Sequence, residues 1–178
     1  GEVAALILAV NPQVAPDVLP ALSQFAGAGS VVISVMAGRT ISFLEESFPK
    51  SAVIRTIPNT PAAIGRGITV AVPNARADEK ARALTDALLR SSGPVEWIED
   101  ENLMDAATAV SGSGPAYVFL LAETLARAGE KAGLPKELAA RLARETVSGA
   151  SELLYRSGLP ASKLRENVTS PNGTTAAA

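Results

Sequence analysis

The stretch that decides the fold reads VVISVMAGRTISFLEESFPKSAVIRTI over residues 31–57. It begins with a β-branched run, Val31 to Val35, and ends with a second one, Val53 to Ile57. Between these runs, Thr40 is suited to cap the start of a helix that continues to Phe48. A strand, a helix and a second strand in this order predict two strands of a parallel sheet joined by a crossover helix.

The same alternation extends over the first hundred residues. Further apolar runs occupy residues 6–10, 68–72 and 95–98, and helical patterns occupy residues 17–25 and 78–92, where Gly93 stops the second helix. The runs are apolar at successive positions, which is typical of strands buried on both faces. The pattern therefore predicts an α/β domain over residues 1–100 with a mainly parallel sheet.

From residue 101 onward the pattern becomes purely helical. Gly133-Leu134-Pro135 and Gly158-Leu159-Pro160 each combine a helix-ending glycine with a helix-starting proline. The helix between them is about 33 Å long at 1.5 Å per residue, which is too long for the core of so small a domain. We expect residues 101–178 to form a helical oligomerisation domain, with a single-chain bundle as the alternative. The stripe that a second chain would cover consists of Leu138, Leu142, Thr146, Gly149 and Leu153.

Composition excludes several classes of chemistry. The chain has no histidine and no cysteine, so it has no imidazole base, no thiolate nucleophile, no disulfide and no metal site built from those ligands. A net charge of −2 gives no electrostatic footprint for nucleic acid or an anionic membrane. No apolar run approaches the roughly 18–20 residues that span a bilayer. We expect a cytoplasmic protein without a metal, a nucleic-acid partner or a membrane partner.

Glycine-rich segments do not supply a dinucleotide fingerprint. That fingerprint, G-x-G-x-x-G, follows a strand and opens a helix so that backbone N–H groups hold the pyrophosphate. Gly27-Ala28-Gly29 and Gly65-Arg66-Gly67 precede strands, and Gly112-Ser113-Gly114 has Tyr117 at the position of the third small residue. A phosphate loop, if the protein has one, is expected upstream of these residues.

Two loops follow predicted parallel strands at the edge where open α/β sheets bind ligands. Ala37-Gly38 follows the strand at 31–35, and Asn59-Thr60-Pro61 follows the strand at 53–57. Function and a plain turn are equally good interpretations of both loops. The segment from Ser111 to Tyr117 is interpreted as a tight helix-to-helix junction rather than a direct catalytic element.

Residues 167–176 form a hydroxyl-rich turn near the end of the sequence. Ser170 and two threonines supply hydroxyl groups, Asn172-Gly173 permits positive φ, and a helix beginning at Ala176 would point its free N–H groups at the turn. Such a turn binds a carboxylate well. A capped helix start without a ligand is the alternative.

Taken together, these segments resemble the 1-pyrroline-5-carboxylate reductase family. The resemblance rests on six stretches that occur in the family's order over nearly the whole chain: residues 8–13, 37–41, 58–61, 111–117, 132–135 and 167–175. It implies reduction of 1-pyrroline-5-carboxylate to L-proline by NADPH or NADH. It also implies a doubly wound Rossmann domain, here in part, followed by an all-helical dimerisation domain that assembles into dimers and often into a decamer.

The resemblance also implies roles for individual residues. Thr175 is implied as the catalytic hydroxyl near the substrate ring nitrogen. Substrate-binding positions are Glu101, Ser170, Gly173, Thr174 and Thr175. Cofactor-binding positions are Val10, Asn11, Pro12, Ala37, Gly38, Asn59 and Asn167.

Three departures from the family's pattern qualify this expectation. Asn11 replaces a lysine, which removes a positive charge near the cofactor, and Asn172 replaces the first glycine of the turn, where asparagine tolerates left-handed geometry. The phosphate loop and the closing helices are not among the 178 residues, so these residues alone are not expected to turn over. The alternatives are a related imine or 3-hydroxy-acid oxidoreductase and a non-catalytic oligomerising homologue.

Overall fold

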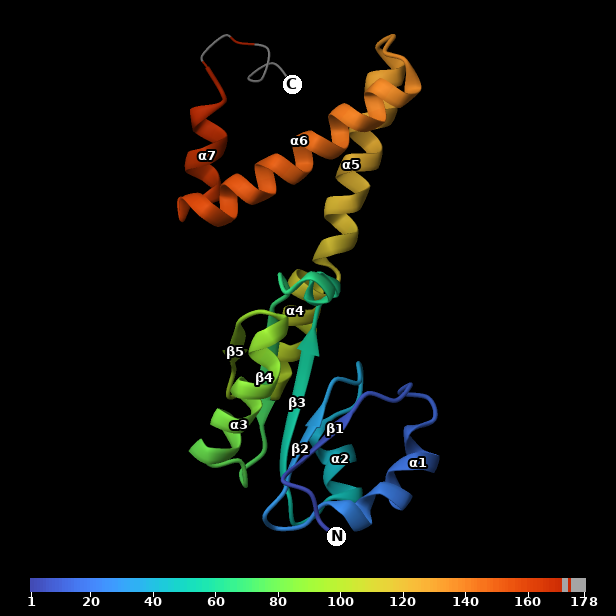
Figure 1. Ribbon diagram of the computed structural model, residues 1–178, viewed down its shortest axis with the longest axis vertical. Helices are drawn as coiled ribbons and strands as arrows, with labels where there is room; N and C mark the ends of the chain where they lie inside the picture. Colours follow the sequence, from blue (N-terminus) through green and yellow to red (C-terminus); the bar gives the residue numbers. More distant parts are fainter. Residues whose placement is uncertain (171–172, 174–178) are drawn as a thin grey trace. The chain divides into compact units, whose positions relative to one another are not determined.

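The computed structural model describes residues 1–170 and Gly173. It divides the chain into two compact units, Gly1–Pro115 and Ala116–Ala178, each of which is described by itself (Figure 1). The sequence pattern predicted a boundary between residues 100 and 101. The fifteen residues between the two positions belong by their packing to the first unit.

The first unit is built on a five-stranded sheet with the order β1-β2-β3-β4-β5. Neighbouring strands are parallel except β3 and β4, which are antiparallel. A parallel connection needs a crossover of a dozen or more residues, and the short link between β3 and β4 contains only a 3₁₀ turn. The strands are β1 (Ala5–Leu8), β2 (Val31–Ser34), β3 (Ala52–Pro58), β4 (Thr69–Pro73) and β5 (Val95–Trp97).

The first strand ends two residues earlier than the predicted run at residues 6–10. β1 stops at Leu8, and Asn11 then closes a turn in which its side-chain oxygen accepts a hydrogen bond from Gln13 N at 2.9 Å. An asparagine side chain that accepts a hydrogen bond from the backbone N–H two residues later favours a turn over strand pairing. This turn explains why β1 ends before residue 10.

Three helices cover the two faces of the sheet. Helices α1 (Ala15–Leu22) and α2 (Ile41–Ser47) pack on one face through Leu19 and Leu44, and α3 (Glu79–Leu89) packs on the other through Ala81. The predicted cap at Thr40 is confirmed, since its side chain accepts a hydrogen bond from Phe43 N, and Asp78 caps α3 in the same way by accepting one from Ala81 N. Each such cap is worth about 1 kcal/mol.

The first unit ends in a chain of short helical turns. A 3₁₀ turn (Glu101–Leu103) leads into α4 (Met104–Ala107) and then into a single π turn (Thr108–Gly112). Met104 is fully buried against Ile57, Val70 and Val72 of the sheet. The next helix begins at Gly114, so the prediction of a helix-to-helix junction at residues 111–117 is confirmed.

The second unit consists of helices α5 (Gly114–Lys131), α6 (Lys136–Ser157) and α7 (Ala161–Asn167), the first of which begins in the first unit. Both predicted glycine stops are confirmed, since Gly133 has φ 100° and Gly158 has φ 64°. The prolines of the two triplets are N-caps, one position earlier than predicted. No helix among the described residues is long and apolar enough to cross a membrane.

Candidate functional site

Three loops of the first unit follow the carboxyl ends of adjacent parallel strands. Strands β1, β2 and β3 run parallel side by side, so the loops that follow them lie at one edge of the sheet. These loops contain six of the seven predicted cofactor-binding residues: Val10, Asn11, Pro12, Ala37, Gly38 and Asn59. The structure therefore brings to one edge the segments that the sequence pattern singled out separately.

The loops after β1 and β2 are joined by Arg39. Its Nε donates to Pro12 O at 2.8 Å, and its Nη2 donates to the same oxygen. The guanidinium also lies over the Phe43 ring, 4.6 Å from the ring centroid. Arg39 was not among the predicted site residues, because the carbonyl that it bonds lies 27 positions away in the sequence.

The loop after β2 is fixed at its start and open in its middle. Ser34 Oγ accepts a hydrogen bond from Met36 N at 3.2 Å, and Met36 is buried. Gly38 has φ 71°, and a Cβ atom built there would meet no heavy atom within 4 Å. The backbone at Gly38 is therefore accessible to a ligand.

Asn59 holds three segments together through its side chain. Its Nδ2 donates to Ser111 O at 3.1 Å, and its Oδ1 accepts from Ile68 N at 3.0 Å. These bonds connect the end of β3 with the start of β4 and with the π turn. The structure thus shows a packing role for Asn59, and its predicted contact with a cofactor stays a prediction.

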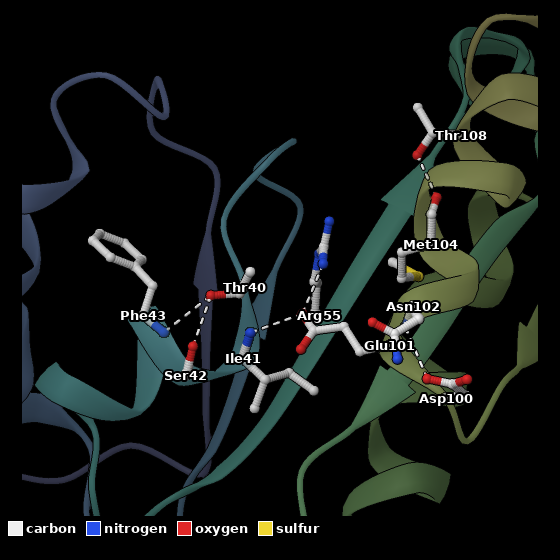
Figure 2. A network of polar contacts seen from close by, with 10 residues as sticks. All are labelled: Thr40, Ile41, Ser42, Phe43, Arg55, Asp100, Glu101, Asn102, Met104 and Thr108. Atoms are coloured by element: carbon white, nitrogen blue, oxygen red, sulfur yellow. Dashed lines mark hydrogen bonds and ion pairs between the residues drawn. The ribbon is translucent and has the colours of Figure 1, made fainter.

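Glu101 joins the loop after β2 to the centre of the sheet (Figure 2). Its Oε1 accepts a hydrogen bond from Ile41 N at 2.9 Å and one from Arg55 Nη1 at 2.7 Å. Ile41 is the first residue of α2, and Arg55 lies on β3. Arg55 was not predicted as a site residue. It lies in a strand among apolar residues, and nothing in the neighbouring sequence indicates its partner Glu101, which is 46 positions away.

Arg55 is a buried charge, with 5% of its surface exposed. A buried guanidinium is costly unless it is paired and hydrogen-bonded, and Glu101 supplies that partner. In the part of the chain that the structure describes, Arg55 Nε is the buried side-chain nitrogen without a hydrogen-bond partner. The pairing with Glu101 therefore carries much of the electrostatic compensation for this charge.

The remaining predicted site residues belong to the second unit. Asn167 is the last residue of α7 and is exposed, as is Ser170. Gly173 N donates to Ser170 O at 3.0 Å, a bond that is typical of a four-residue turn. Thr174 and Thr175, which the resemblance implies for substrate binding and catalysis, lie outside the described residues, as does Asn172.

Comparison with known proteins shows which family the chain is similar to. Residues 101–178 match the family model described as pyrroline-5-carboxylate reductase dimerisation. Over 97% of its length the chain is 44% identical to a pyrroline-5-carboxylate reductase of Synechocystis and 40% identical to pyrroline-5-carboxylate reductase 1 of Bacillus subtilis. Over nearly its whole length the chain is therefore similar to pyrroline-5-carboxylate reductases.

Solved structures of pyrroline-5-carboxylate reductases agree with this assignment. The enzyme of Coxiella burnetii superposes with a TM-score of 0.89 at 35% identity, and that of Plasmodium falciparum, described with NADP bound, with 0.83 at 34% identity. Each alignment covers 98% of this chain, and 65% and 66% of those two chains. The predicted fold, a Rossmann-like sheet followed by helices, is confirmed.

The chain is shorter than its relatives. It covers 64% of the Synechocystis protein and 58% of the Bacillus subtilis protein. The chain thus spans about three fifths of the length of the curated pyrroline-5-carboxylate reductases that it matches. The family model begins at residue 101, where the sequence pattern set the domain boundary, whereas the packing of residues 101–115 places them with the sheet.

Proposed function

We propose that the full-length protein reduces 1-pyrroline-5-carboxylate to L-proline with NADPH or NADH. The observation that carries the proposal is the shared sheet edge, where loops from β1, β2 and β3 gather the predicted cofactor-binding residues. Similarity to pyrroline-5-carboxylate reductases supports the substrate, and the Plasmodium falciparum relative with NADP bound supports the cofactor.

The residues at this edge fit a nicotinamide cofactor. The open backbone at Gly38 allows close approach of a ligand, and Arg39 adds a positive charge next to the loop where Asn11 replaces the family's lysine. Val10, Pro12 and Ala37 would line the same edge. Asn167, the last residue of α7, is proposed as a further cofactor-binding residue.

The substrate is proposed to be held by the turn near the C-terminus. Hydroxyl and backbone N–H groups of Ser170, Gly173, Thr174 and Thr175 would bind its carboxylate, and the hydroxyl of Thr175 would bond or protonate the ring nitrogen. The predicted substrate contact of Glu101 stays a prediction beside the two intramolecular contacts of its carboxylate.

The chemistry suits a chain without histidine or cysteine. When bound, the cofactor supplies a hydride. A protonated imine is already electrophilic. The hydride electron pair forms the new C–H bond, and the two π electrons of the C=N bond move onto nitrogen and become the lone pair of the amine. The protein therefore needs to orient the reactants and complement their charge, and no strong side-chain base is required.

Self-association and location belong to the same proposal. We propose that two copies associate through the second unit, because α5 and α6 expose large apolar side chains such as Tyr117, Phe119 and Leu153, and because that region matches a dimerisation family. Larger assemblies of such dimers, including the decamer that the resemblance implies, would need a further interface besides this one. A cytoplasmic location is proposed because a reductase of this kind needs the pool of reduced nicotinamide cofactor.

The test is a cofactor-oxidation assay with the full-length protein. We expect NADPH or NADH absorbance to fall when 1-pyrroline-5-carboxylate is added, with L-proline as the product. Oxidation with a bulkier cyclic imine or a 3-hydroxy acid but not with 1-pyrroline-5-carboxylate would favour the related oxidoreductases. Failure to bind either cofactor would favour a non-catalytic oligomerising homologue.

A further inference from the structure

The row of side chains across β2, β3 and β4 has a charged residue at its centre. Ser34 pairs with Arg55 in the parallel register of β2 and β3, and Val72 pairs with Arg55 in the antiparallel register of β3 and β4. On the same face, Val53 belongs to the apolar cluster under α1 and α2, while Ile57 belongs to the cluster under α4. Arg55 therefore lies between two apolar clusters, where a hydrophobic residue would be expected.

The partner of this charge comes from the segment that begins the match to the dimerisation family. Glu101 is the first residue of that match and lies in a 3₁₀ turn whose start is fixed by Asp100, whose side chain accepts a hydrogen bond from Asn102 N. One turn later, Met104 is fully buried against the sheet. Glu101 thus extends from a turn whose backbone is held in place by these contacts.

The second partner of Glu101 fixes the far end of a loop. Ile41 N donates to Glu101, and the Ile41 side chain packs on the cluster that contains Met104. At the start of the loop, Met36 is buried, and its backbone N–H donates a hydrogen bond to Ser34 Oγ. Only residues 37–40 lie between these two fixed points, so the position of Ile41 sets the path of Ala37 and Gly38.

We propose that the Arg55–Glu101 pair is a positioning device that holds the loop of residues 37–40 in place for the nicotinamide cofactor. Arg55 orients the carboxylate, and the carboxylate holds the first N–H of α2 (Figure 2). This inference rests on the proposed function, because the loop's ligand is the proposed cofactor. It gives Glu101 a role that acts through the cofactor loop and not through contact with the substrate.

The experiment compares three variants of the full-length protein: Glu101→Ala, Glu101→Gln and the control Glu99→Ala. Glu99 forms a similar ion pair with Arg82, but its side chain is exposed, and its partner does not belong to the loop of residues 37–40. Three quantities are measured: the Kd of NADPH by fluorescence titration, the KM of the imine substrate, and hydrogen exchange of the peptide containing Ile41 in the cofactor-free protein.

The positioning role predicts a specific pattern. Glu101→Ala raises the Kd of NADPH by about fivefold or more and speeds exchange at Ile41, while the KM of the imine stays within about twofold. Glu101→Gln keeps an oxygen that accepts from Ile41 N, so its Kd stays near the wild-type value even though its Tm falls because Arg55 loses its counter-charge. Glu99→Ala changes none of the three quantities.

Four results would overturn the inference. An unchanged NADPH Kd in folded Glu101→Ala removes the positioning role, and a raised imine KM with unchanged Kd indicates direct substrate contact instead. If Glu101→Ala does not fold, Glu101→Gln is the deciding variant. An NADPH Kd that rises while the Tm of this variant falls would show that the Arg55–Glu101 pair is purely structural. If wild-type protein does not bind NADPH at all, the proposed function fails, and this role fails with it.

Discussion

Arg39 shows how one side chain can define a site that no local pattern reveals. Its guanidinium bonds the carbonyl of Pro12 and lies over the ring of Phe43, so it connects two loops and the start of α2. Strand order predicted that the loop after β2 lies at the ligand edge, whereas the resemblance implied that the loop after β1 binds the cofactor. Strand order could not place Arg39 or Arg55, because their partners become neighbours only when the sheet forms.

Replacing Arg39 tests whether it holds these loops. We expect Arg39→Ala to lower the free energy of unfolding by about 1–3 kcal/mol, since it removes hydrogen bonds worth about 1 kcal/mol each and a cation–π contact worth about 0.5–1 kcal/mol. Arg39→Lys should recover less than half, because an ammonium cannot reproduce the planar, two-pronged contact. Urea unfolding measures both; equal stability of Arg39→Ala and wild type would contradict the contact's role.

Thr175 tests the proposed chemistry at the residue scale. In the full-length protein, Thr175→Ala should lower kcat/KM for the imine substrate at least tenfold, about 1.4 kcal/mol. The control is Ser151→Ala, which removes a hydroxyl that bonds within α6. Steady-state kinetics that show equal values for Thr175→Ala and wild type would remove Thr175 from the mechanism.

The ion pair between Glu99 and Arg82 predicts that the thermal stability of the protein depends on pH. Two hydrogen bonds from Arg82, at 2.7 and 2.9 Å, lower the pKa of Glu99 below its ordinary value. Because the folded-state pKa is the lower one, the pair stabilises the protein at neutral pH, and this contribution is lost as the pH falls through that pKa. The Tm difference between wild type and Glu99→Gln should therefore shrink in acid; a difference that grows in acid would contradict the assignment.

At the scale of elements, helix bounds were easier to predict than helix faces. The predicted helix from Pro135 to about Arg156 is α6, Lys136–Ser157, because glycine and proline mark its ends locally. Leu142 and Leu153 of the predicted stripe are exposed, as expected of a face that a second chain would cover. The face that α6 buries within the chain, at Ala139 and Ala143, was not predicted. Small residues allow α5 and α6 to approach closely at Gly129, and nothing in the periodicity of large residues indicates that contact.

Two adjacent alanines test this packing. A Cβ built at Gly129 would lie 3.2 Å from Ala139 Cβ, so a larger residue at position 139 has no room. We expect Ala139→Leu to destabilise the protein by about 1–3 kcal/mol, as overpacking does. Ala140→Leu, on the exposed side of the same turn, should change stability little. Thermal unfolding compares the two; equal effects would contradict the close helix contact.

At the scale of the whole molecule, the second unit is incomplete as a single copy. Its helices bury few apolar residues within the described chain, whereas Tyr117, Phe119 and Leu121 are more than half exposed. Apolar surface of this extent marks an interaction site. The spacing of apolar and small residues and the length of the helix predicted a stripe on α6 that one chain leaves uncovered, but the full exposed surface also includes residues of α5.

The proposed self-association can be tested on this surface. We expect full-length protein to sediment as a dimer or a larger even assembly, and Phe119→Glu to shift it toward the monomer because a buried charge at the interface is costly. Lys163→Glu, a charge change on exposed α7, serves as the control. A monomeric wild type at micromolar concentration would contradict the proposed interface.

We propose that the full-length protein transfers a hydride to the C=N carbon of a cyclic imine. The carboxylate of this substrate is on another carbon of the ring. The most direct measurement supplies the protein with 1-pyrroline-5-carboxylate and NADPH deuterated at the transferable position, and then analyses the product by mass spectrometry. We expect L-proline that carries one deuterium at the former imine carbon. Unlabelled proline, or no proline while wild-type protein binds NADPH, would contradict this expectation.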